Sequence, residues 1–462
     1  MDRPHQTIND TIAAIATPMG EAGLAVIRVS GKQALHIVDA VFAPIGKSSL
    51  KPSLASTHTI QYGRIEQDGK TVDEVMVSVF KAPRTFTRED VVEISTHGGT
   101  LPAKMVLDTL LEKGARLAEP GEFTLRAFLN GRIDLTQAEA VADVIHSRTE
   151  LALTAANEQL AGKLSQRIRE LRNQLMSLLA HIEAHIDFPD EDISPDTRTQ
   201  MVDRLQFSLD FMSRLLATAR EGRILRRGIR AAIVGRPNAG KSSLLNQLLG
   251  HDRAIVSHVE GTTRDTIEET ASIRGIPIIF IDTAGLRESS DVIEQEGIRR
   301  SRKSIEQAEL VLHVVDGIAA LHEEDLAFLD KQHLKACLHI LNKSDLESHP
   351  SLREEKKHAW IEVSCETGAG LEPLKDAIRD MVWSGEISAE MLEVMINSRH
   401  QDALSRSKTA LETVRTGLEN DLELELIAMD LRIAVGAIGE IVGETTTEDL
   451  LDSIFSQFCL GK

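Results

Sequence analysis

The chain is poor in aromatic residues and in cysteine, and it has no long hydrophobic run. Only 3% of its 462 residues are aromatic, which argues against a surface that stacks single-stranded nucleic-acid bases and against an all-β fold. Three scattered cysteines are too few for a disulfide scaffold or a four-cysteine zinc site, and they fit a reducing compartment. No apolar stretch approaches the ~18–20 residues that span a membrane, and the N-terminus does not read as a signal peptide. We therefore predict a cytoplasmic protein with no membrane attachment.

Positive charge is also scarce, because 52 Lys and Arg residues stand against 71 Asp and Glu residues, for a net charge of −19. The last 80 residues alone carry 6 − 15 = −9. This acidity argues against non-specific binding of nucleic acid over the whole surface, although not against a local basic site. Hydrophobic residues make up 42% and charged residues 27%, a balance that predicts a folded globular chain of about three domains.

Three patterns follow one another along the chain. Residues 1–125 alternate short apolar runs with Gly, Pro and Ser, which predicts an α+β domain. Residues 126–222 and 383–462 repeat apolar side chains every three or four positions, which predicts the long helices of a bundle. Residues 223–382 alternate apolar strands with helix-length segments, the pattern of a parallel α/β domain. The economical interpretation is a helical domain that an α/β domain interrupts.

Individual elements can be placed within these patterns. The final helix is well marked, because Thr447 can cap it and Glu448 and Asp449 favour its positively polarised first turn. The other expected helices include residues 103–111 and 243–249. The expected strands are residues 25–29, 75–80, 91–94, 231–234, 278–281, 310–315, 338–341 and 360–363.

A glycine-rich motif, Gly-Arg-Pro-Asn-Ala-Gly-Lys-Ser at residues 235–242, follows an expected strand and opens an expected helix. This is the P-loop pattern, whose backbone amides wrap phosphate groups at the helix N-terminus. Lys241 would reach the β- and γ-phosphates, and Ser242 would ligate Mg²⁺. A glycine turn before a helix is the alternative. The residues predicted to bind nucleotide here are Asn238, Ala239, Gly240, Lys241, Ser242 and Ser243.

Two later motifs predict that the nucleotide is GTP. Asn-Lys-Ser-Asp at residues 342–345 follows an expected strand, and the Asp345 carboxylate would accept two hydrogen bonds from N1–H and N2–H₂ of guanine. Adenine lacks this pair of donors. Ser364 and Cys365 follow the next expected strand and fit the loop that contacts guanine O6. The predicted guanine site comprises Asn342, Lys343, Asp345, Ser364 and Cys365, in a Ras-like P-loop GTPase domain.

Asp-Thr-Ala-Gly at residues 282–285 completes the nucleotide motifs. Asp282 would hold the Mg²⁺ shell and the Gly285 amide would sense the γ-phosphate, with Thr283 and Ala284 between them. The next position is Leu286, where many GTPases place a water-orienting Gln, so hydrolysis is either very slow or assisted by another group. Candidates for that group are Arg287, Glu288, Asp291 and Glu294, and residues 261–265 would form a mobile switch.

With these motifs in place, the chain resembles the MnmE (TrmE) family of tRNA-modification GTPases over essentially its full length. Outside the nucleotide motifs, the resemblance rests on Gly121-Glu-Phe, on Arg-Ala-Phe-Leu-Asn-Gly at residues 126–131, and on the ending Phe-Ser-Gln-Phe-Cys-Leu-Gly-Lys. It implies that a bound K⁺ replaces the missing Gln. The ligands of this K⁺ would be Asn238, Ser257, Val259 and Thr262. Thr263 would join Ser242 as a ligand of Mg²⁺. His258, Glu260 and Gly261 would complete the loop at the GTP, and Glu294 would be the catalytic glutamate. A solvated loop carboxylate is the alternative for Glu294.

The resemblance also implies a folate site and a functional thiol. Arg28, Glu93, Arg132 and Lys462 match positions that hold a 5-formyl- or methylene-tetrahydrofolate, although Arg28 and Glu93 could simply pair with each other. Cys459 would be a catalytic thiol near the modification centre. It could also be a small buried hydrophobic residue, and it fits a prenylation motif poorly.

The function implied by the resemblance is wobble-uridine modification of certain tRNAs. A homodimer would act with the FAD-dependent partner MnmG in a heterotetramer, adding an aminomethyl or carboxymethylaminomethyl group at C5. Arginines at positions 223, 226, 227, 230 and 236 would contact tRNA or form ion pairs at an interdomain hinge. The alternative function is a GTP-controlled binding switch, such as a ribosome-assembly GTPase.

Overall fold

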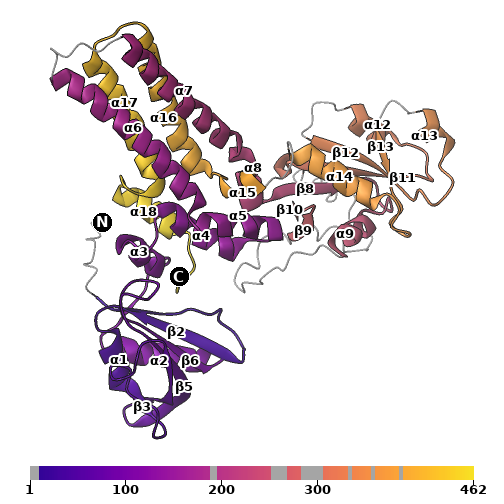
Figure 1. The fold of residues 1–462 in the computed structure, drawn as a ribbon. Helices are drawn as coiled ribbons and strands as arrows, with labels where there is room; N and C mark the ends of the chain where they lie inside the picture. The colour runs from indigo at the N-terminus through magenta and orange to yellow at the C-terminus, as the bar shows by residue number, and fades with distance from the viewer. Residues whose placement is uncertain are drawn as a thin grey trace. The chain divides into compact units, whose positions relative to one another are not determined.

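The computed structural model describes residues 10–187, 195–250, 268–281, 305–330, 336–354, 359–383 and 389–462 (Figure 1). The chain divides into two compact units, one of residues 1–142 with 436–462 and the other of residues 143–435. The predicted domain divisions after residues 125, 222 and 382 lie inside these units and stay predictions. None of the helices in the described ranges has the length and apolar character needed to cross a membrane.

The first unit is built on a seven-stranded sheet with the order β3-β4-β5-β6-β2-β1-β7. All neighbouring strands are antiparallel except β1 and β7. Alternate residues of β4 and β5 are buried, as expected where one sheet face packs on helices and the other is open. The expected strands and the expected helix in this region are confirmed. The elements are β1 Ile12–Ile15, β2 Leu24–Ser30, α1 Ala34–Val41, β3 Phe42–Pro44, β4 Thr59–Gln67, β5 Lys70–Phe80, β6 Val91–His97, α2 Thr100–Glu112 and β7 Arg116–Leu117.

Three helices complete this unit: α3 Glu122–Leu129, α4 Leu135–His146, which runs into the second unit, and α18 Glu448–Phe455. The Thr447 hydroxyl accepts a hydrogen bond from the Leu450 amide, so the predicted cap of α18 is confirmed. Apolar side chains from both ends of the sequence form one core here, which anchors the C-terminal segment to the N-terminal unit. Its buried members are Leu135, Ala138, Leu451, Ile454, Phe455 and Phe458.

The second unit contains long amphipathic helices, as the three- and four-residue spacing predicted. In α6, Lys163–Asp187, the inward stripe includes Leu164, Ile168 and Leu175, each at most 1% exposed. Helices from both sides of the α/β segment pack together, because α7 runs along α16 and the Arg415 guanidinium donates to Gln206 Oε1. The remaining bundle elements are α5 Glu150–Leu160, α7 Pro195–Ala217, α8 Ala219–Arg227, α15 Ala389–Glu393, α16 Ser398–Glu419 and α17 Leu424–Val442.

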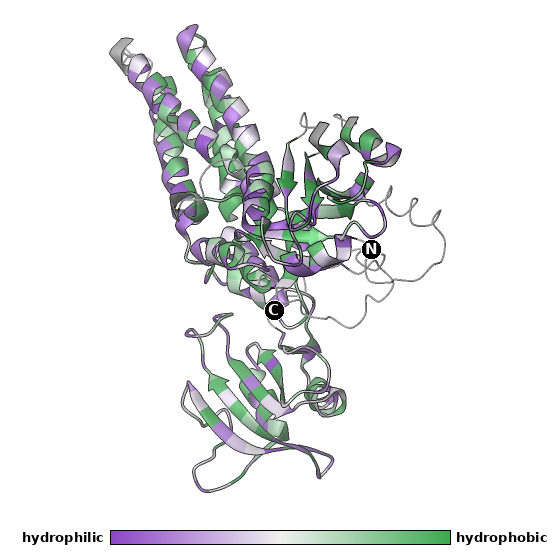
Figure 2. Ribbon diagram, turned by 90° about the vertical axis from the view of Figure 1, so that its right-hand side faces the viewer, coloured by the Kyte–Doolittle hydropathy of each residue, from purple (hydrophilic) through white to green (hydrophobic). Residues whose placement is uncertain are grey.

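The second unit also holds a six-stranded sheet with the order β13-β12-β11-β8-β10-β9, parallel except for the β9–β10 hairpin. Its central strands β8 and β11 are mostly apolar (Figure 2), as expected where helices cover both faces of a sheet, with Arg230, His313 and Asp316 as the exceptions. The carboxyl ends of β8 and β12 point to one edge of this sheet. The elements are β8 Ile229–Val234, α9 Lys241–Gly250, β9 Glu269–Ile273, β10 Ile276–Phe280, β11 Leu310–Asp316, α12 Glu323–Asp330, β12 Ala336–Asn342, α13 Pro350–Glu354, β13 Trp360–Glu362 and α14 Leu371–Val382.

Candidate nucleotide site and C-terminal tail

The P-loop between β8 and α9 needs its glycines for steric reasons. Gly235 has φ +143°, and a Cβ there would lie 2.1 Å from the carbonyl oxygen of Val314. Gly240 has φ +95°, and a Cβ there would lie 2.0 Å from Nδ2 of Asn342. Both distances are far inside van der Waals contact, and both φ values disfavour any other residue. The glycines therefore allow the loop to pass close to its neighbours.

Lys241 begins α9 and is held by its own loop. Its Nζ donates a hydrogen bond to the carbonyl oxygen of Arg236 at 2.8 Å. Burial lowers the pKa of the Lys241 ammonium, because the charged form loses solvation. A phosphate group would favour the charged form again, so the loop can hold a nucleotide anion at the amino end of α9.

Asn342, at the end of β12, joins the P-loop to the guanine loop. Its Nδ2 donates to the carbonyl oxygen of Ala239 at 2.9 Å, and its Oδ1 accepts from the Cys365 amide at 3.2 Å. The residue is only 2% exposed, so both hydrogen bonds are protected from water. The structure thus brings together three predicted loops, those of Ala239, Asn342 and Cys365. The first lies more than 100 residues before the other two in sequence.

Neighbouring residues hold the backbone and Lys343 of the guanine loop in place, and the Asp345 carboxylate remains exposed to solvent. Lys343, at φ +68°, places its Nζ 2.6 Å from Oδ2 of Asp316. The Ser344 amide donates to the Val363 carbonyl oxygen at 3.1 Å, while the Asp345 side chain is exposed. Burial, together with the nearby Asp345 charge, raises the pKa of the Cys365 thiol to about 11. A raised pKa disfavours the thiolate, which is the nucleophilic form of cysteine.

Two supporting residues in this site were not predicted. Asp316 ends β11 and pairs with Lys343, and Gln247 of α9 donates to the Cys365 carbonyl oxygen at 2.7 Å. A carboxylate at the end of an apolar strand was the available signal for Asp316. Gln247 carried no signal, because a polar residue on a helix face is ordinary.

Several predicted nucleotide residues lie outside the described residues. They are Ser257, His258, Val259, Glu260, Gly261, Thr262, Thr263, Asp282, Thr283, Ala284, Gly285 and Glu294. Their roles stay predictions.

The predicted folate residues Arg28 and Glu93 face each other on β2 and β6. The Arg28 Nη2 lies 2.8 Å from Glu93 Oε1, so the simple pairing considered from the sequence is present. Arg28 does more than this, because its Nη1 donates to the carbonyl oxygen of Gly461 at 3.1 Å and its guanidinium lies 5.6 Å from the centroid of the Phe123 ring. The strand pair and the C-terminal tail therefore meet at one side chain.

The tail itself is docked through its backbone. Gly461 has φ +88°, and a Cβ there would lie 2.6 Å from the Ile15 carbonyl oxygen. The amide of Phe123 donates to the Lys462 carbonyl oxygen at 3.1 Å. The Cys459 side chain is exposed, so the interpretation of this cysteine as a buried hydrophobic residue is wrong. Arg132 is exposed, and within the described residues no hydrogen bond or ion pair connects it to the Arg28 pair.

The arginines that follow α7 have mixed surroundings. Arg226 forms an ion pair with Asp143, and Arg230 places Nη2 2.7 Å from Glu268 Oε1. Ion pairing therefore accounts for these two positions. It does not account for the exposed positions 223 and 227.

The comparisons with known proteins cover nearly the whole chain. A model of the MnmE helical domain matches residues 135–459, and a model of the GTP-binding protein TrmE N-terminus matches residues 11–132. The chain is 46% identical over 461 residues to a tRNA modification GTPase MnmE of Geobacillus thermodenitrificans, covering 98% of this chain and 99% of the relative. It is 44% identical over 458 residues to a tRNA modification GTPase MnmE of Listeria welshimeri, with the same coverage.

Among solved structures, the chain is similar to a variant of Aquifex aeolicus Era bound to GDP and AlF₄⁻ and to the G domain of the T. maritima FeoB transporter. The Era match is 30% identical, covers 39% of this chain and 66% of that chain, and has a TM-score of 0.27. The FeoB match is 25% identical, covers 34% of this chain and 99% of that chain, and has a TM-score of 0.25. These scores are too low to relate the overall folds. The family models and the near full-length relatives place the chain in the MnmE (TrmE) family of tRNA-modification GTPases.

Proposed function

We propose that this GTPase of tRNA modification hydrolyses GTP in a K⁺-dependent reaction and acts with the FAD-dependent partner MnmG. Together they would install an aminomethyl or carboxymethylaminomethyl group at C5 of the wobble uridine of certain tRNAs, using a tetrahydrofolate one-carbon unit. Residues 1–125 would bind the folate and form a homodimer, and residues 223–382 would be a G domain inserted in the helical domain. The full-length similarity supports this enzyme over a GTP-controlled binding switch.

One observation carries the nucleotide part of the proposal, namely the two hydrogen bonds through which Asn342 joins the P-loop to the guanine loop. The metal ligands proposed in the described residues fit oxygen-seeking cations. Ser242 lies in the first turn of α9, and Asn238 stands exposed at φ +63° with an amide oxygen available. K⁺ would supply positive charge beside the developing negative charge of the γ-phosphate, with Ser257, Val259 and Thr262 as further ligands. Mg²⁺ would take Ser242 and Thr263, and Glu294 would orient water.

The rate of GTP hydrolysis will therefore depend on the monovalent cation. We expect the rate in KCl to exceed the rate in NaCl of equal ionic strength by about tenfold or more, because Leu286 offers no group to orient water or stabilise charge. Asn238→Ala should remove most of this difference while the affinity for GDP stays close to wild type. Steady-state phosphate release in the two salts measures it, and equal rates in KCl and NaCl would contradict the K⁺ site.

The folate part of the proposal rests on the meeting of Arg28, Glu93 and Gly461. A carboxylate beside an arginine can match both the donor pair of a pterin ring and the acidic tail of a folate. Because both side chains remain partly exposed, at 22% and 29%, they are open to a ligand. The docked tail would place the Cys459 thiol in the same unit as this ligand.

The affinity for 5-formyltetrahydrofolate should depend on Arg28, which pairs with Glu93. We expect Arg28→Ala to weaken binding by about tenfold or more, as measured by isothermal titration calorimetry, because a charge-assisted hydrogen bond is lost. Arg64→Ala is the matched control, since Arg64 forms a similar cross-strand pair with Glu74 in the same sheet. Equal losses in both variants would mean that the ligand does not use Arg28.

The role of the tail thiol can be tested in tRNA. We expect cells whose sole copy carries Cys459→Ser to lose the C5 modification of the wobble uridine, because serine is a far weaker nucleophile than a thiolate. Mass analysis of nucleosides from purified tRNA measures this. Cys337→Ser is the control, because that thiol is partly buried in β12 and burial raises its pKa to about 11, which disfavours the thiolate. Unchanged modification in the Cys459 variant would remove the thiol from the mechanism.

A further inference from the structure

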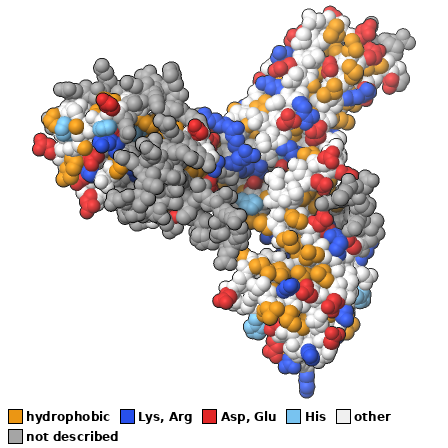
Figure 3. All heavy atoms as spheres, turned by 180° about the vertical axis from the view of Figure 1, so that it is seen from behind, with side chains coloured by type: hydrophobic (Ala, Val, Ile, Leu, Met, Phe, Trp, Pro, Cys, Tyr) orange, Lys and Arg blue, Asp and Glu red, His pale blue; other side chains and the backbone are white. Residues whose placement is uncertain are grey.

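The outer face of α8 carries a line of arginines on a chain whose net charge is −19. Arg220, Arg223 and Arg227 are exposed and follow each other at spacings of three and four residues, so their side chains leave the helix on one face. The buried face is formed by residues that include Ile224 and Leu225. Figure 3 shows Lys and Arg side chains gathered at the end of the helical bundle where Figure 1 places α8.

Among the described residues, carboxylate partners are scarce for the arginines of α8. Arg226, one position from Arg227, pairs with Asp143. In contrast, Arg223 and Arg227 make no hydrogen bond or ion pair within the described part of the chain, and Arg220 donates only to a carbonyl oxygen, that of Val382 at 3.4 Å. No described residue therefore occupies the donors of these two guanidinium groups, which can bind an external anion.

Helix stability does not explain the line. A cation in the last turn of a helix interacts favourably with the helix dipole, which gives Arg227 a reason to be there. Arg223 lies in the middle of α8, outside the reach of that effect. The single carboxylate of α8, Glu221, is only 4% exposed and belongs to the opposite face, so it does not neutralise the line.

We propose that Arg220, Arg223 and Arg227 bind the phosphate backbone of the tRNA substrate. The substrate class rests on the proposed function, and the site goes beyond it. A strongly acidic protein repels a polyanion over most of its surface, so contact must be local. Guanidinium groups suit this contact because they hold phosphate oxygens through two parallel hydrogen bonds. Arg227 lies seven residues after Arg220, which is ~10 Å along the helix and long enough for more than one phosphate contact.

The test uses the full-length chain and a fluorescently labelled, unmodified transcript of a tRNA with uridine at the wobble position. Binding is measured by anisotropy over a range of NaCl concentrations, with K⁺ and Mg²⁺ held constant. We expect Arg223→Gln with Arg227→Gln to raise Kd by about tenfold or more at ~0.1 M salt. The slope of log Kd against log salt should fall by about two, one for each phosphate contact. Arg223→Lys with Arg227→Lys should keep the slope, because the charges remain.

A matched control separates the site from a general charge effect. Arg406→Gln with Arg432→Gln makes the same change in net charge at two exposed arginines that already pair with Asp402 and Glu183. Its Kd should stay within about twofold of wild type. Equal weakening in the control, or an unchanged slope in the α8 variant, would overturn the α8 site alone. Failure of the wild-type chain to bind the transcript would overturn the proposed tRNA contact altogether.

Discussion

Replacing Asp345 by Asn will shift the nucleotide preference of the chain from GTP to XTP. We expect the affinity for GTP to fall by about 10³-fold or more. The Asp345 carboxylate is predicted to accept two hydrogen bonds from guanine, whereas an asparagine amide at this position would place its own N–H donors against the N2 amino group. Xanthine carries an oxygen where guanine carries that amino group, and the new amide can donate to it. Competition between fluorescent GTP and XTP analogues measures the shift.

The structure explains why this substitution should act on recognition and leave the loop intact. Lys343 is held by Asp316, and the Ser344 amide is held by the Val363 carbonyl oxygen, whereas the Asp345 carboxylate is exposed. Glu347→Gln is the matched control, since it removes an exposed carboxylate two residues further on. An Asp345→Asn variant that still prefers GTP over XTP to the wild-type extent would disprove the assigned contact.

The motifs predict that the P-loop and the guanine loop meet, as they do at Asn342, because the information for this is local in the sequence. The P-loop and the Asn-Lys-Ser-Asp motif each follow an apolar strand, and parallel strands end at one edge of their sheet. The motifs alone thus predict that Lys241 and Asp345 belong to one site. The long helices were also predictable, because a stripe such as Leu164, Ile168 and Leu175 repeats with the helical period.

The tail and the ionic contacts around α3 carry no such local signal. Arg28 reaches the carbonyl oxygen of Gly461 across 433 positions in sequence, and no periodicity predicts that pair. The resemblance to a family points to Arg28, Glu93 and Lys462, but it does not predict how their side chains are arranged. Burial of Arg126 at 3% exposure was likewise unforeseen, because arginine is usually exposed unless it is paired.

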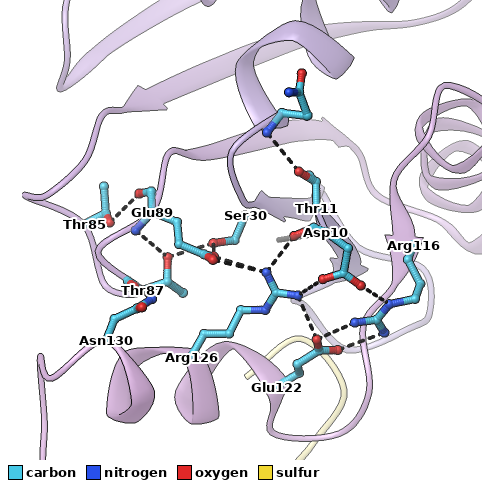
Figure 4. A network of polar contacts seen from close by, with 11 residues as sticks. Asp10, Thr11, Ser30, Thr85, Thr87, Glu89, Arg116, Glu122, Arg126 and Asn130 are labelled. Atoms are coloured by element: carbon cyan, nitrogen blue, oxygen red, sulfur yellow. Dashed lines mark hydrogen bonds and ion pairs between the residues drawn. The ribbon is translucent and has the colours of Figure 1, made fainter. Parts of the chain in front are cut away.

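Arg126 is the centre of an ionic network that joins α3 to the sheet of the first unit (Figure 4). Its guanidinium donates to Glu89 Oε1 at 3.2 Å, to Glu122 Oε1 at 3.0 Å and to the carboxylate of Asp10. Glu89, 9% exposed, also accepts from the Ser30 hydroxyl at 2.7 Å. Burial raises the pKa of the Asp10 carboxyl, but hydrogen bonds from two arginines outweigh this and hold that pKa below its usual value.

Arg126→Met should therefore destabilise the first unit by about 3–5 kcal/mol, because it leaves the Glu89 carboxylate, 9% exposed, without its cation. Amide hydrogen exchange measures this, and we expect exchange in α3 and β1 to accelerate by about a hundredfold or more. Arg64→Met is the control, since its pair with Glu74 is exposed and should leave exchange unchanged.

The same network predicts how the wild-type unit responds to acid. Because the pKa of Asp10 is lowered in the folded chain, its contribution to stability is present above pH ~4 and is lost as the pH falls through the folded value. Arg126→Met removes one of the two cations that lower this pKa, so its exchange rates in β1 should depend less on pH between about 4 and 2. Wild-type and variant profiles that remain parallel over this range would mean that Arg126 does not hold the Asp10 charge. The amide of Gly121, just before α3, and the amide of Phe123, in its first turn, both donate hydrogen bonds to the C-terminal tail. Loosening α3 should therefore also release the backbone that carries Cys459.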